Sequence, residues 1–298
     1  MTVLVIHEDE DGNSVREFLV EPGEEFGTDL GVLEVPEDIQ PGETLETHLG
    51  TEFRVRRLRG PDLFHHFERT GAPMVPRDVG LVIGETGVCQ GDRVLDAGTG
   101  TGVLAASMAR AGATVTTYER DPEFAEVARE NMALANVAES VEVRAGNVLE
   151  DLDELVSSET GPNCGVESDE SERESDTDAE TDSKTKTETE TDGDAETNAD
   201  ADTATDDGSF DVLTLDTGDA ASVVERAPEL LVKGGFLAVY SPFIESTREV
   251  VATARDVGLS EITTRETIQR EMDFDDRGSR PSTAPVGHTG YLTIARND

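Results

Sequence analysis

The sequence predicts an α/β fold in which a doubly wound, mostly parallel sheet ends in antiparallel C-terminal strands and follows a small N-terminal β-barrel or sandwich module. Three observations predict it. Short β-prone segments separated by turns fill residues 1–60. From residue 93 onward, apolar strand patterns alternate with helical patterns, which is typical of parallel sheets. A turn with glycine at positions 98, 100 and 102 joins the first of these strands to a helix.

These patterns divide the chain into parts. Residues 1–60 form the N-terminal β module, punctuated by Pro-Gly pairs at 22–23 and 41–42, and residues 61–75 form a linker. Residues 76–298 form the second domain, which an acidic segment over 157–208 interrupts.

The expected elements of the linker and of the first half of the second domain follow in order. They are a short helix over 62–70, a helix over 76–87, a strand over 93–97, a helix over 103–112, a strand over 114–119, a helix over 124–137 and a strand over 141–147. Pro76 and the Asp121-Pro122 pair are helix-start signals, and Gly87 is a stop signal.

The second half resumes the alternation. We expect a strand over 210–216, a helix over 223–235, a strand over 236–242 and a helix over 246–258. Two strands over 261–272 and 288–296, joined by a long loop, complete the sheet as an antiparallel pair.

The chain is strongly acidic, with a formal net charge of −42 at pH 7. Residues 157–208 hold 19 acidic and three basic residues, so the remainder keeps a charge of −26. The acidic segment has too few apolar side chains to offset chain entropy, which predicts a disordered surface-loop insertion; a regulatory or partner-binding role is the alternative. Acidity over the whole surface, few lysines and no tryptophan favour a halophilic, cytoplasmic protein, with an acidic protein of an ordinary cell as the alternative.

Other classes of function are disfavoured by composition. No apolar run reaches membrane-spanning length and no signal peptide is evident, so we expect a soluble protein without a membrane partner. Cys89 and Cys164 are far apart in sequence and suit a reducing compartment. The CxxC and HExxH motifs are absent, so we expect no metal.

The glycine turn predicts a ligand that approaches backbone N–H groups closely. Its spacing is G-x-G-x-G, because Val103 stands where the dinucleotide fingerprint has its third glycine. Glu119 ends the next strand, where such folds place an acid on ribose hydroxyls. This pair resembles motif I and the acidic loop of the Rossmann-like class I S-adenosylmethionine-dependent methyltransferases; a nicotinamide or flavin dinucleotide is the alternative ligand.

Ligands of such sheets lie beyond the carboxyl ends of the strands, which selects the candidate cofactor residues. By analogy the turn takes the methionine part and Glu119 the ribose, while Asn147 reaches the adenine edge and Phe124 packs on it; a turn cap and a core residue are the alternatives for the last two. The full candidate set is Gly98, Thr99, Gly100, Thr101, Gly102, Glu119, Phe124, Asn147 and Asp216.

Asp216 is the candidate catalytic residue. A methyl group on a sulfonium is already activated, so the protein has to align the nucleophile and stabilise moving charge. A carboxylate that accepts a hydrogen bond from the exocyclic amine of adenine would hold the base and stabilise the cation formed by methylation of a ring nitrogen. Methylation of an exocyclic amine is disfavoured because the strand end reads DTGD rather than D/N-P-P-Y, and methylation of cytosine carbon is disfavoured because neither cysteine follows proline.

At this level the chain resembles the tRNA (adenine-N1) methyltransferase family. The resemblance covers nearly all of the chain outside the acidic segment. Its carriers are FGTDLGVL (26–33), RTGAPMVPRD (69–78), VLDAGTGTG (94–102), the strand that ends at Asp216, and RPSTAPVGHTGYL (280–292). The resemblance implies S-adenosylmethionine as the cofactor, tRNA as the substrate, a homotetramer, and methylation of N1 of adenine 58 in the T-loop, in archaeal members also of adenine 57.

The sequence departs from the family at two positions. Val75 stands where members often carry an aromatic residue or histidine that stacks on the target base, and Asn147 replaces a more usual acid. His288 and Tyr291 are candidates to hold the flipped adenine, with a core role as the alternative.

The predicted RNA contacts are few because the chain is acidic. The densest basic cluster is RVRRLR (54–59), where period-two spacing puts Arg54 and Arg56 on one face and Arg57 and Arg59 on the other. A salt-bridged, solvated strand is an equal alternative. The expected phosphate contacts are Arg54, Arg56, Arg57, Arg69, Arg77 and Arg280, with shape, hydrogen bonding and stacking carrying most of the affinity.

Two further functions remain open at this stage. One is a class I methyltransferase that acts on a protein or a small molecule. The other is a catalytically silent tRNA-binding subunit, which the intact glycine turn, Glu119 and Asp216 disfavour.

Overall fold

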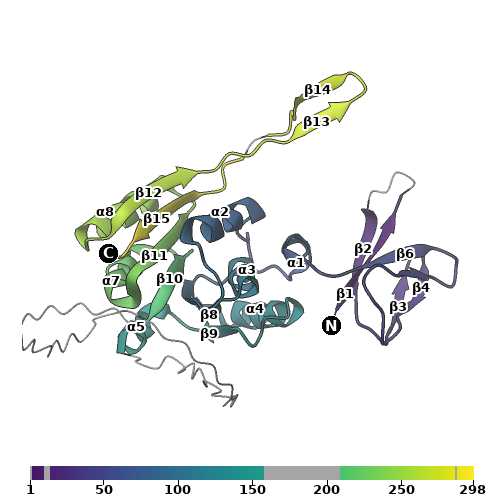
Figure 1. The fold of residues 1–298 in the computed structure, drawn as a ribbon, viewed down its shortest axis with the longest axis horizontal. Helices are drawn as coiled ribbons and strands as arrows, with labels where there is room; N and C mark the ends of the chain where they lie inside the picture. The colour runs from purple at the N-terminus through teal and green to yellow at the C-terminus, as the bar shows by residue number, and fades with distance from the viewer. Residues whose placement is uncertain (1, 10–13, 158–208, 286) are drawn as a thin grey trace, which may run out of the picture. The chain divides into compact units, whose positions relative to one another are not determined.

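The N-terminal part of the computed structural model consists of short antiparallel strands (Figure 1). The structure describes residues 2–9, 14–157, 209–285 and 287–298. Four strands form one sheet in the order β2-β1-β6-β5, and β3 and β4 form a separate hairpin. Their bounds are β1 Val3–Glu8, β2 Ser14–Val20, β3 Glu25–Thr28, β4 Gly31–Glu34, β5 Thr44–Glu46 and β6 Glu52–Arg56.

These two small sheets share one apolar core. Val5 of β1, Leu33 of β4 and Phe53 of β6 are fully buried in it. Along β6, burial alternates from residue to residue, so that Phe53 and Val55 point inward while Arg54 and Arg56 point outward. The alternation stops at Arg57, which is exposed beyond the end of the strand, so the second arginine face expected at 57 and 59 does not form.

The remainder of the chain alternates strands and helices as the sequence predicts. The elements are α1 Gly60–His66, α2 Pro76–Thr86, β7 Arg93–Ala97, α3 Val103–Ala111, β8 Thr114–Glu119, α4 Pro122–Leu134, β9 Val141–Ala145, α5 Val148–Ser157, β10 Phe210–Leu215, α6 Ala220–Val224, α7 Ala227–Leu230, β11 Leu231–Ser241, α8 Ile244–Asp256, β12 Ser260–Glu266, β13 Met272–Asp275, β14 Gly278–Pro281 and β15 Tyr291–Arg296. The predicted acidic insertion over 157–208 lies outside the described residues, except for Ser157 at the end of α5.

Seven of these strands form the central sheet, in the order β12-β15-β11-β10-β7-β8-β9. The pairings from β11 through β10, β7 and β8 to β9 are all parallel, and β15 is antiparallel to both β11 and β12. The chain winds outward from β7 through β8 to β9 and then returns to β10 on the other side of β7. The topological switch point therefore lies between β7 and β10, where open α/β sheets bind ligands.

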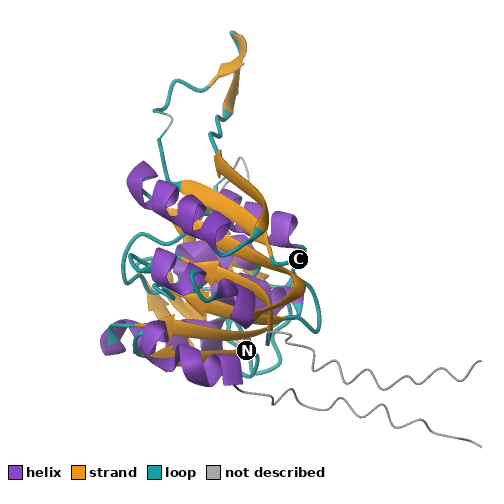
Figure 2. Cartoon of the chain, turned by 90° about the vertical axis from the view of Figure 1, so that its left-hand side faces the viewer, coloured by secondary structure: helices purple, strands orange, loops and turns teal. Residues whose placement is uncertain are grey.

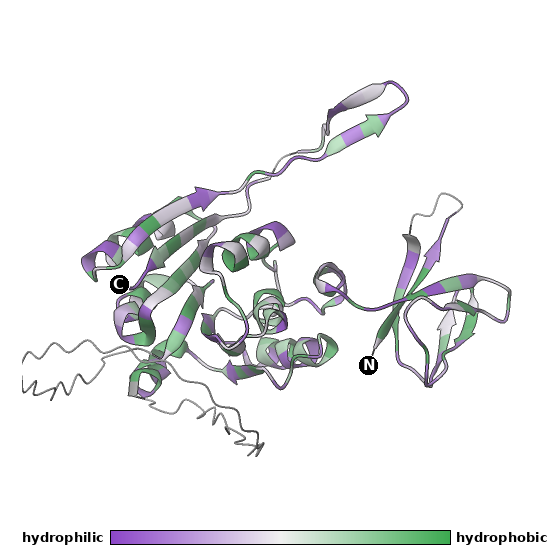
Figure 3. Ribbon diagram, in the orientation of Figure 1, coloured by the Kyte–Doolittle hydropathy of each residue, from purple (hydrophilic) through white to green (hydrophobic). Residues whose placement is uncertain are grey.

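Helices lie on both faces of this sheet (Figure 2), and hydrophobic residues recur along its strands (Figure 3). In β7, Val94 belongs to the core beneath α2, α3 and α4, and its neighbour Leu95 belongs to the core beneath α5, α6, α7 and α8. Leu213 and Leu237 of the next strands are also fully buried on the second face. A parallel sheet with both faces covered produces the near-continuous apolar strands seen in the sequence.

Two predicted helices are shorter than expected. The helix predicted over 62–70 is α1, which begins at Gly60 because Pro61 suits its first turn and ends at His66. The helix predicted over 223–235 breaks into α6 and α7, and Leu231 instead begins β11 beside Phe210. Leu231 is fully buried there, so packing in the sheet overrides the helical pattern.

The predicted loop between the last two strands contains the β13–β14 hairpin. Met272 pairs with Pro281 and Asp275 with Gly278. The Asp275 carboxylate accepts the Arg277 N–H at 2.8 Å, and Gly278 has φ of +132°, which together fix the turn. The strand predicted over 261–272 ends at Glu266, and the strand predicted over 141–147 ends at Ala145.

Helix α5 is an element that the sequence pattern does not predict.

Among the described residues, every helix is too short or too polar to span a lipid bilayer.

Candidate functional site

A cavity of about 400 Å³ opens at the carboxyl ends of β7, β8, β9 and β10. It is of the size that small-molecule ligands occupy. All nine predicted cofactor residues line it: Gly98, Thr99, Gly100, Thr101, Gly102, Glu119, Phe124, Asn147 and Asp216. The segment Thr70–Met74, which precedes α2, lines it as well. The structure therefore gathers residues from four strand ends and one loop into a single site.

The glycine turn forms the floor of this cavity in a backbone conformation that other residues adopt rarely. Gly98 has φ of +98°, and a Cβ there would lie 2.1 Å from the Asp216 carbonyl oxygen. Gly102 has φ of +82°, and a Cβ there would lie 2.5 Å from Met132 Cε. At Gly100, with φ of +50°, only the Gly98 carbonyl oxygen comes as near as 4.0 Å. Gly98 is thus needed because its neighbour is backbone, and Gly102 is favoured by its positive φ, since the end of the Met132 side chain can shift. Gly100 leaves room for close approach of a ligand, as S-adenosylmethionine would require.

Backbone N–H groups of the turn are held by the end of β8. Gly98 and Thr99 donate to the Tyr118 carbonyl at 3.0 and 3.2 Å. Gly100 donates to one carboxylate oxygen of Glu119 at 2.9 Å, and Asp121 donates to the other at 3.1 Å. The Glu119 carboxylate is therefore fixed beside the turn at the cavity wall, where it suits hydrogen bonding to vicinal hydroxyls of a ribose.

Beneath the cavity lies a buried network that was not predicted from the sequence. The Asp96 carboxylate accepts hydrogen bonds from Thr117 at 2.6 Å and Thr214 at 2.5 Å. Thr117 is also 2.5 Å from the hydroxyl of Thr99 in the turn. Burial raises the pKa of the Asp96 carboxyl, although the two threonine hydrogen bonds oppose the shift. A charged residue inside the apolar run of β7 was the sequence signal for this network.

Asp216, directly after β10, is joined to the strand end of β7 by its backbone, since its N–H donates to the Ala97 carbonyl at 2.8 Å. Burial, and then the neighbouring Asp96 carboxylate, raises the pKa of the Asp216 carboxyl to about 7. A carboxyl with such a pKa in a cavity is a candidate functional group, because burial disfavours its charge unless a cation or a donor reaches it.

The remaining predicted cofactor residues are Phe124 and Asn147, which also line the cavity. Phe124, near the start of α4, is 38% exposed and lines the cavity. Asn147 follows β9, and its side-chain oxygen accepts the Leu149 N–H at 3.2 Å at the start of α5. Asn147 therefore caps a turn and also faces the cavity, so its two proposed roles are compatible.

The predicted RNA-contacting arginines do not gather in one place. Arg54 and Arg56 lie on the same face of β6, and both pair with Glu8 at 2.6 Å. Arg69 donates to the Phe64 carbonyl and lies over its ring. Arg280 lies 3.8 Å from Asp273 across the β13–β14 hairpin. Each of these four side chains is exposed and held by a local partner.

Arg77 differs from these because it is only 18% exposed. It donates to the Thr289 hydroxyl at 2.9 Å, and Thr289 donates to Asp78 at 2.9 Å. This contact joins α2 to the segment that precedes β15. Gly290 beside it is required, because a Cβ there would lie 2.4 Å from the Tyr240 ring. The two segments that this contact joins, 69–78 and 280–292, are both among those that carry the family resemblance in the sequence.

His288 is not among the residues that line the cavity. Its ring nitrogens lie 2.7 Å from a Glu266 carboxylate oxygen and 3.0 Å from the Pro242 carbonyl, and its ring packs 4.9 Å from that of Tyr291. The two acceptors raise the pKa of the imidazole, the Pro242 carbonyl first. Val75 occupies the N-cap position of α2 without a side-chain hydrogen bond, next to the cavity-lining loop. Within the described residues, no three His, Cys, Asp or Glu side chains form a cluster suited to a metal ion.

Comparison with known proteins agrees with this geometry. Residues 79–159 match the family profile described as ribosomal protein L11 methyltransferase (PrmA). Two solved structures share the fold over almost the whole chain. One is an S-adenosylmethionine-dependent O-methyltransferase from Thermotoga maritima, with a TM-score of 0.68, 22% identity, and coverage of 99% of this chain and 92% of that chain. The other is the tRNA (m1A58) methyltransferase TrmI from Aquifex aeolicus, with a TM-score of 0.63, 18% identity, and coverage of 100% and 97%.

The strand order, the glycine turn at the switch point and these structural similarities define a class I S-adenosylmethionine-dependent methyltransferase fold. Sequence similarity narrows the class further. The chain is 32% identical to the tRNA (adenine(57)-N(1)/adenine(58)-N(1))-methyltransferase TrmI of Methanocaldococcus jannaschii, over 96% of this chain and 93% of that protein. It is 25% identical to a tRNA (adenine(58)-N(1))-methyltransferase TrmI of Thermus thermophilus, over 86% and 81%. The chain belongs to the TrmI family of tRNA (adenine-N1)-methyltransferases.

Proposed function

We propose that this protein transfers a methyl group from S-adenosylmethionine to N1 of adenine in the T-loop of tRNA, at position 58 and also at position 57. The observation that carries the proposal is the cavity at the switch point, which combines the open glycine turn, Glu119 and Asp216 in a chain that belongs to the TrmI family. The nearly full-length similarity to TrmI proteins favours this substrate over a protein or a small molecule, and the intact site disfavours a silent subunit.

Different residues of the cavity bind different parts of the cofactor. The backbone around Gly100 receives the methionine part, the Glu119 carboxylate receives the ribose hydroxyls, and Asn147 and Phe124 receive the adenine ring. When bound, the cofactor supplies an activated methyl group on a sulfonium centre. Asp216 also lines the cavity, and a cationic ligand there would favour the ionised form of its buried carboxyl.

Asp216 orients the target base. In its ionised form it accepts a hydrogen bond from the exocyclic amine of adenine, so that the N1 lone pair faces the methyl group. A bound cofactor would supply the methyl group to N1 as its S–C bond breaks, with the electron pair of that bond left on sulfur and the positive charge on the methylated adenine. The Asp216 carboxylate then stabilises this cation. No proton has to be removed from N1.

The RNA is bound by dispersed contacts. Arg54, Arg56, Arg57, Arg69 and Arg280 are exposed and are proposed to contact phosphates, with Arg77 contributing from the α2 junction. The target adenine has to leave the stacked T-loop, and His288 and Tyr291 are proposed to help hold it.

We also propose that the protein is a homotetramer. The β13–β14 hairpin and the segment before it expose Ile268 at 65%, Met272 at 49% and Phe274 at 77%. A two-stranded hairpin alone is marginally stable in water, so contact with another subunit would stabilise it. Light scattering coupled to size exclusion should give a tetramer mass for the wild type, and Phe274→Asp should reduce it. A wild-type monomer would contradict this assembly.

We infer a cytoplasmic protein adapted to concentrated salt. Residues outside 157–208 alone carry a formal charge of −26, and repulsion of that size is screened when salt shortens the Debye length to about 3 Å. The melting temperature should rise steeply between 0.1 and about 2 M KCl. A melting temperature that does not depend on salt would contradict the inference.

The function is tested directly with S-adenosylmethionine labelled in its methyl group and unmodified tRNA transcripts. In molar KCl, the label should appear in tRNA as 1-methyladenosine at positions 58 and 57. Transcripts with guanosine at both positions serve as the control and should stay unlabelled. Label at another nucleotide, or in protein, would contradict the proposal.

A further inference from the structure

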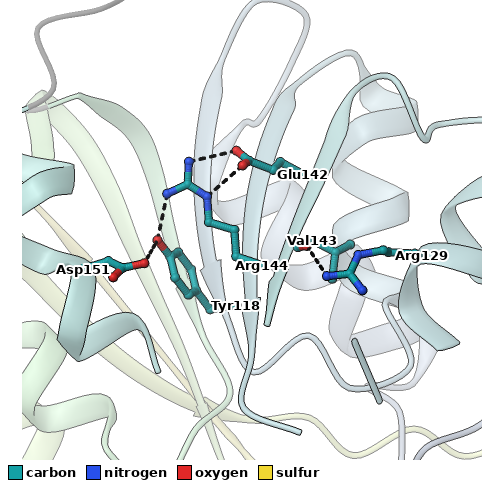
Figure 4. Close-up of polar contacts among 6 residues, drawn as sticks. All are labelled: Tyr118, Arg129, Glu142, Val143, Arg144 and Asp151. Carbon is teal, nitrogen blue, oxygen red and sulfur yellow. Dashed lines mark hydrogen bonds and ion pairs between the residues drawn. The ribbon is translucent and has the colours of Figure 1, made fainter. Parts of the chain in front are cut away.

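Tyr118, which directly precedes Glu119, makes side-chain contacts that cofactor binding does not itself require (Figure 4). It is 3% exposed. Its hydroxyl donates to an Asp151 carboxylate oxygen at 3.0 Å and accepts from Arg144 Nη1 at 3.0 Å. Burial raises the pKa of the Tyr118 hydroxyl, which keeps the proton that it donates. A buried tyrosine hydroxyl with both a donor and an acceptor is fixed in place.

Arg144 is itself held rigidly. Its Nε and Nη2 bond the two carboxylate oxygens of Glu142 at 2.9 and 3.0 Å, and its guanidinium lies 5.7 Å from the Tyr118 ring centroid. The hydrogen bond to Glu142 is the largest cause of a raised pKa of Arg144. A planar, bidentate arginine loses little freedom for each bond it makes, so it can orient the tyrosine.

The network ties together three elements. Tyr118 belongs to β8, Arg144 to β9 and Asp151 to α5. Tyr118 and Arg144 are direct neighbours in the register of the parallel strands. Strand β9 is the edge of the sheet, so on its outer side no further strand of this sheet holds it. The side-chain contacts of Tyr118 therefore hold the edge strand β9 to β8 and α5.

The backbone of the same two residues organises the cavity. The Tyr118 carbonyl accepts the N–H groups of Gly98 and Thr99, and the Glu119 carboxylate accepts that of Gly100. The Glu119 carbonyl accepts the Gly146 N–H at 2.7 Å, two residues beyond Arg144. The position of the β8 end thus sets the positions of the turn and of the ribose-binding carboxylate together.

We propose that Arg144, Tyr118 and Asp151 form a positioning network for the methyl-donor cavity, which acts through Glu119 and the glycine turn. The inference rests on the proposed function, because it assumes that the cavity binds S-adenosylmethionine. Arg144 and Asp151 do not line the cavity, and neither contacts the cofactor in this proposal. Small displacements at such a site are costly for binding and alignment, and this is the physical basis of the network's effect.

A second arginine on the same part of the domain provides a matched control. Arg129 of α4 donates to the Val143 carbonyl of β9 at 2.9 Å (Figure 4). It also pairs with Glu126 at 2.9 Å. It also braces β9, but none of these contacts reaches Tyr118. Arg129→Met thus removes a comparable contact without loosening the end of β8.

The experiment measures binding of S-adenosylhomocysteine by calorimetry in molar KCl for Tyr118→Phe, Arg144→Met, Asp151→Ala and Arg129→Met. The first three should raise the Kd about tenfold, because the Glu119 carboxylate and the glycine turn would then occupy the binding-competent position only about a tenth of the time, and Arg129→Met should leave it within about twofold. For Arg144→Met, which does not line the cavity, kcat at saturating cofactor should stay within about twofold of wild type, so the effect appears in the KM for S-adenosylmethionine. Melting temperatures, recorded in parallel, show that each variant is folded.

A double variant tests whether the residues act as one unit. Tyr118→Phe combined with Arg144→Met should raise the Kd little more than either change alone, because each already breaks the same hydrogen bond. Fully multiplicative effects, an equal rise of Kd in Arg129→Met, or wild-type Kd in all single variants would overturn the positioning role. A wild-type protein that does not bind S-adenosylhomocysteine would instead refute the proposed function.

Discussion

The cavity and the candidate RNA-binding arginines differ in how their residues are arranged. The cavity draws Gly98, Glu119 and Asp216 from separate strands to one edge of the sheet, and backbone hydrogen bonds already hold the first two. The arginines are spread over the β6 strand, the region before α2 and the β13–β14 hairpin, and those such as Arg54 and Arg280 pair with nearby carboxylates.

This difference implies two kinds of binding. The cofactor enters a preformed site, so single changes in the cavity should have large effects. An RNA phosphate has to replace carboxylates such as Glu8 that already hold the arginines, and concentrated salt weakens both interactions. Changes to one or two arginines should therefore have modest effects.

The largest expected effect is that of Asp216→Asn. The amide keeps the shape but loses the charge that stabilises methylated adenine, so kcat should fall by about 10² to 10³. Calorimetry should show cofactor affinity within a few fold of wild type. Asp153→Asn, at an exposed position that pairs with Arg226, is the control and should keep full activity. Retained activity in Asp216→Asn would remove this residue from the reaction.

Next in size is Gly98→Ala. The added Cβ would lie 2.1 Å from the Asp216 carbonyl, so the turn or the end of β10 has to move. We expect the Kd for S-adenosylmethionine to rise at least tenfold, with a lower melting temperature. Gly218→Ala, which also lines the cavity but has open space around its Cβ, should change the Kd much less. Equal effects of the two substitutions would argue against a tightly packed turn.

A smaller, graded effect is expected from pH. The Asp216 carboxyl has a pKa of about 7 and acts as the carboxylate, so kcat/KM should rise with pH below 7, about tenfold per unit, and level off above it. Because this pKa is raised above its ordinary value, the same group makes the fold less stable as pH rises from about 4 to 7. The low activity of Asp216→Asn should lack this rise, and a wild-type profile that is flat from pH 5 to 8 would contradict the assignment.

The smallest effect is expected for tRNA binding by the double variant that combines Arg54→Glu with Arg56→Glu. Both side chains project from one face of β6, and reversal of their charge should weaken tRNA binding about three- to tenfold, with kcat at saturating tRNA preserved. Filter binding at several salt concentrations measures it. The control is Arg16→Glu, which breaks an exposed pair with Asp29 elsewhere in the module and should be nearly neutral. Unchanged binding would exclude the β6 face as a phosphate contact.

The sequence predicted most of the second domain because the spacing of its apolar residues and its proline and glycine boundary residues indicate the same elements. Pro76 and Gly87 bound α2, and the strand, glycine turn and helix from Arg93 onward form where expected. Predictions were wrong where packing outweighed a local pattern. Leu231 reads as part of a helix but is buried in the sheet beside Phe210.

The residues that line the candidate site could be predicted from the sequence. The buried hydrogen bonds that hold those residues in place could not. Gly98 and Glu119 could each be recognised from the sequence. Glycine is the residue that most readily adopts a positive φ, and an acidic residue at the end of the second strand is typical of a ribose-binding site. Asp96 is marked in the sequence as a charge within an apolar run, but its partners Thr117 and Thr214, like the Tyr118 to Arg144 contact, come from pairing between strands that are distant in sequence. Asp216 was predictable from its place at a strand end, whereas its raised pKa comes from burial and from Asp96.

A crystal structure of the protein with S-adenosylhomocysteine would test the central claim most directly. We predict the ribose hydroxyls on the Glu119 carboxylate, the homocysteine part over Gly100, and the thioether sulfur facing the Asp216 side chain across the cavity. A ligand bound elsewhere, or an Asp216 side chain turned away from the sulfur, would contradict the assignment of this cavity to methyl transfer.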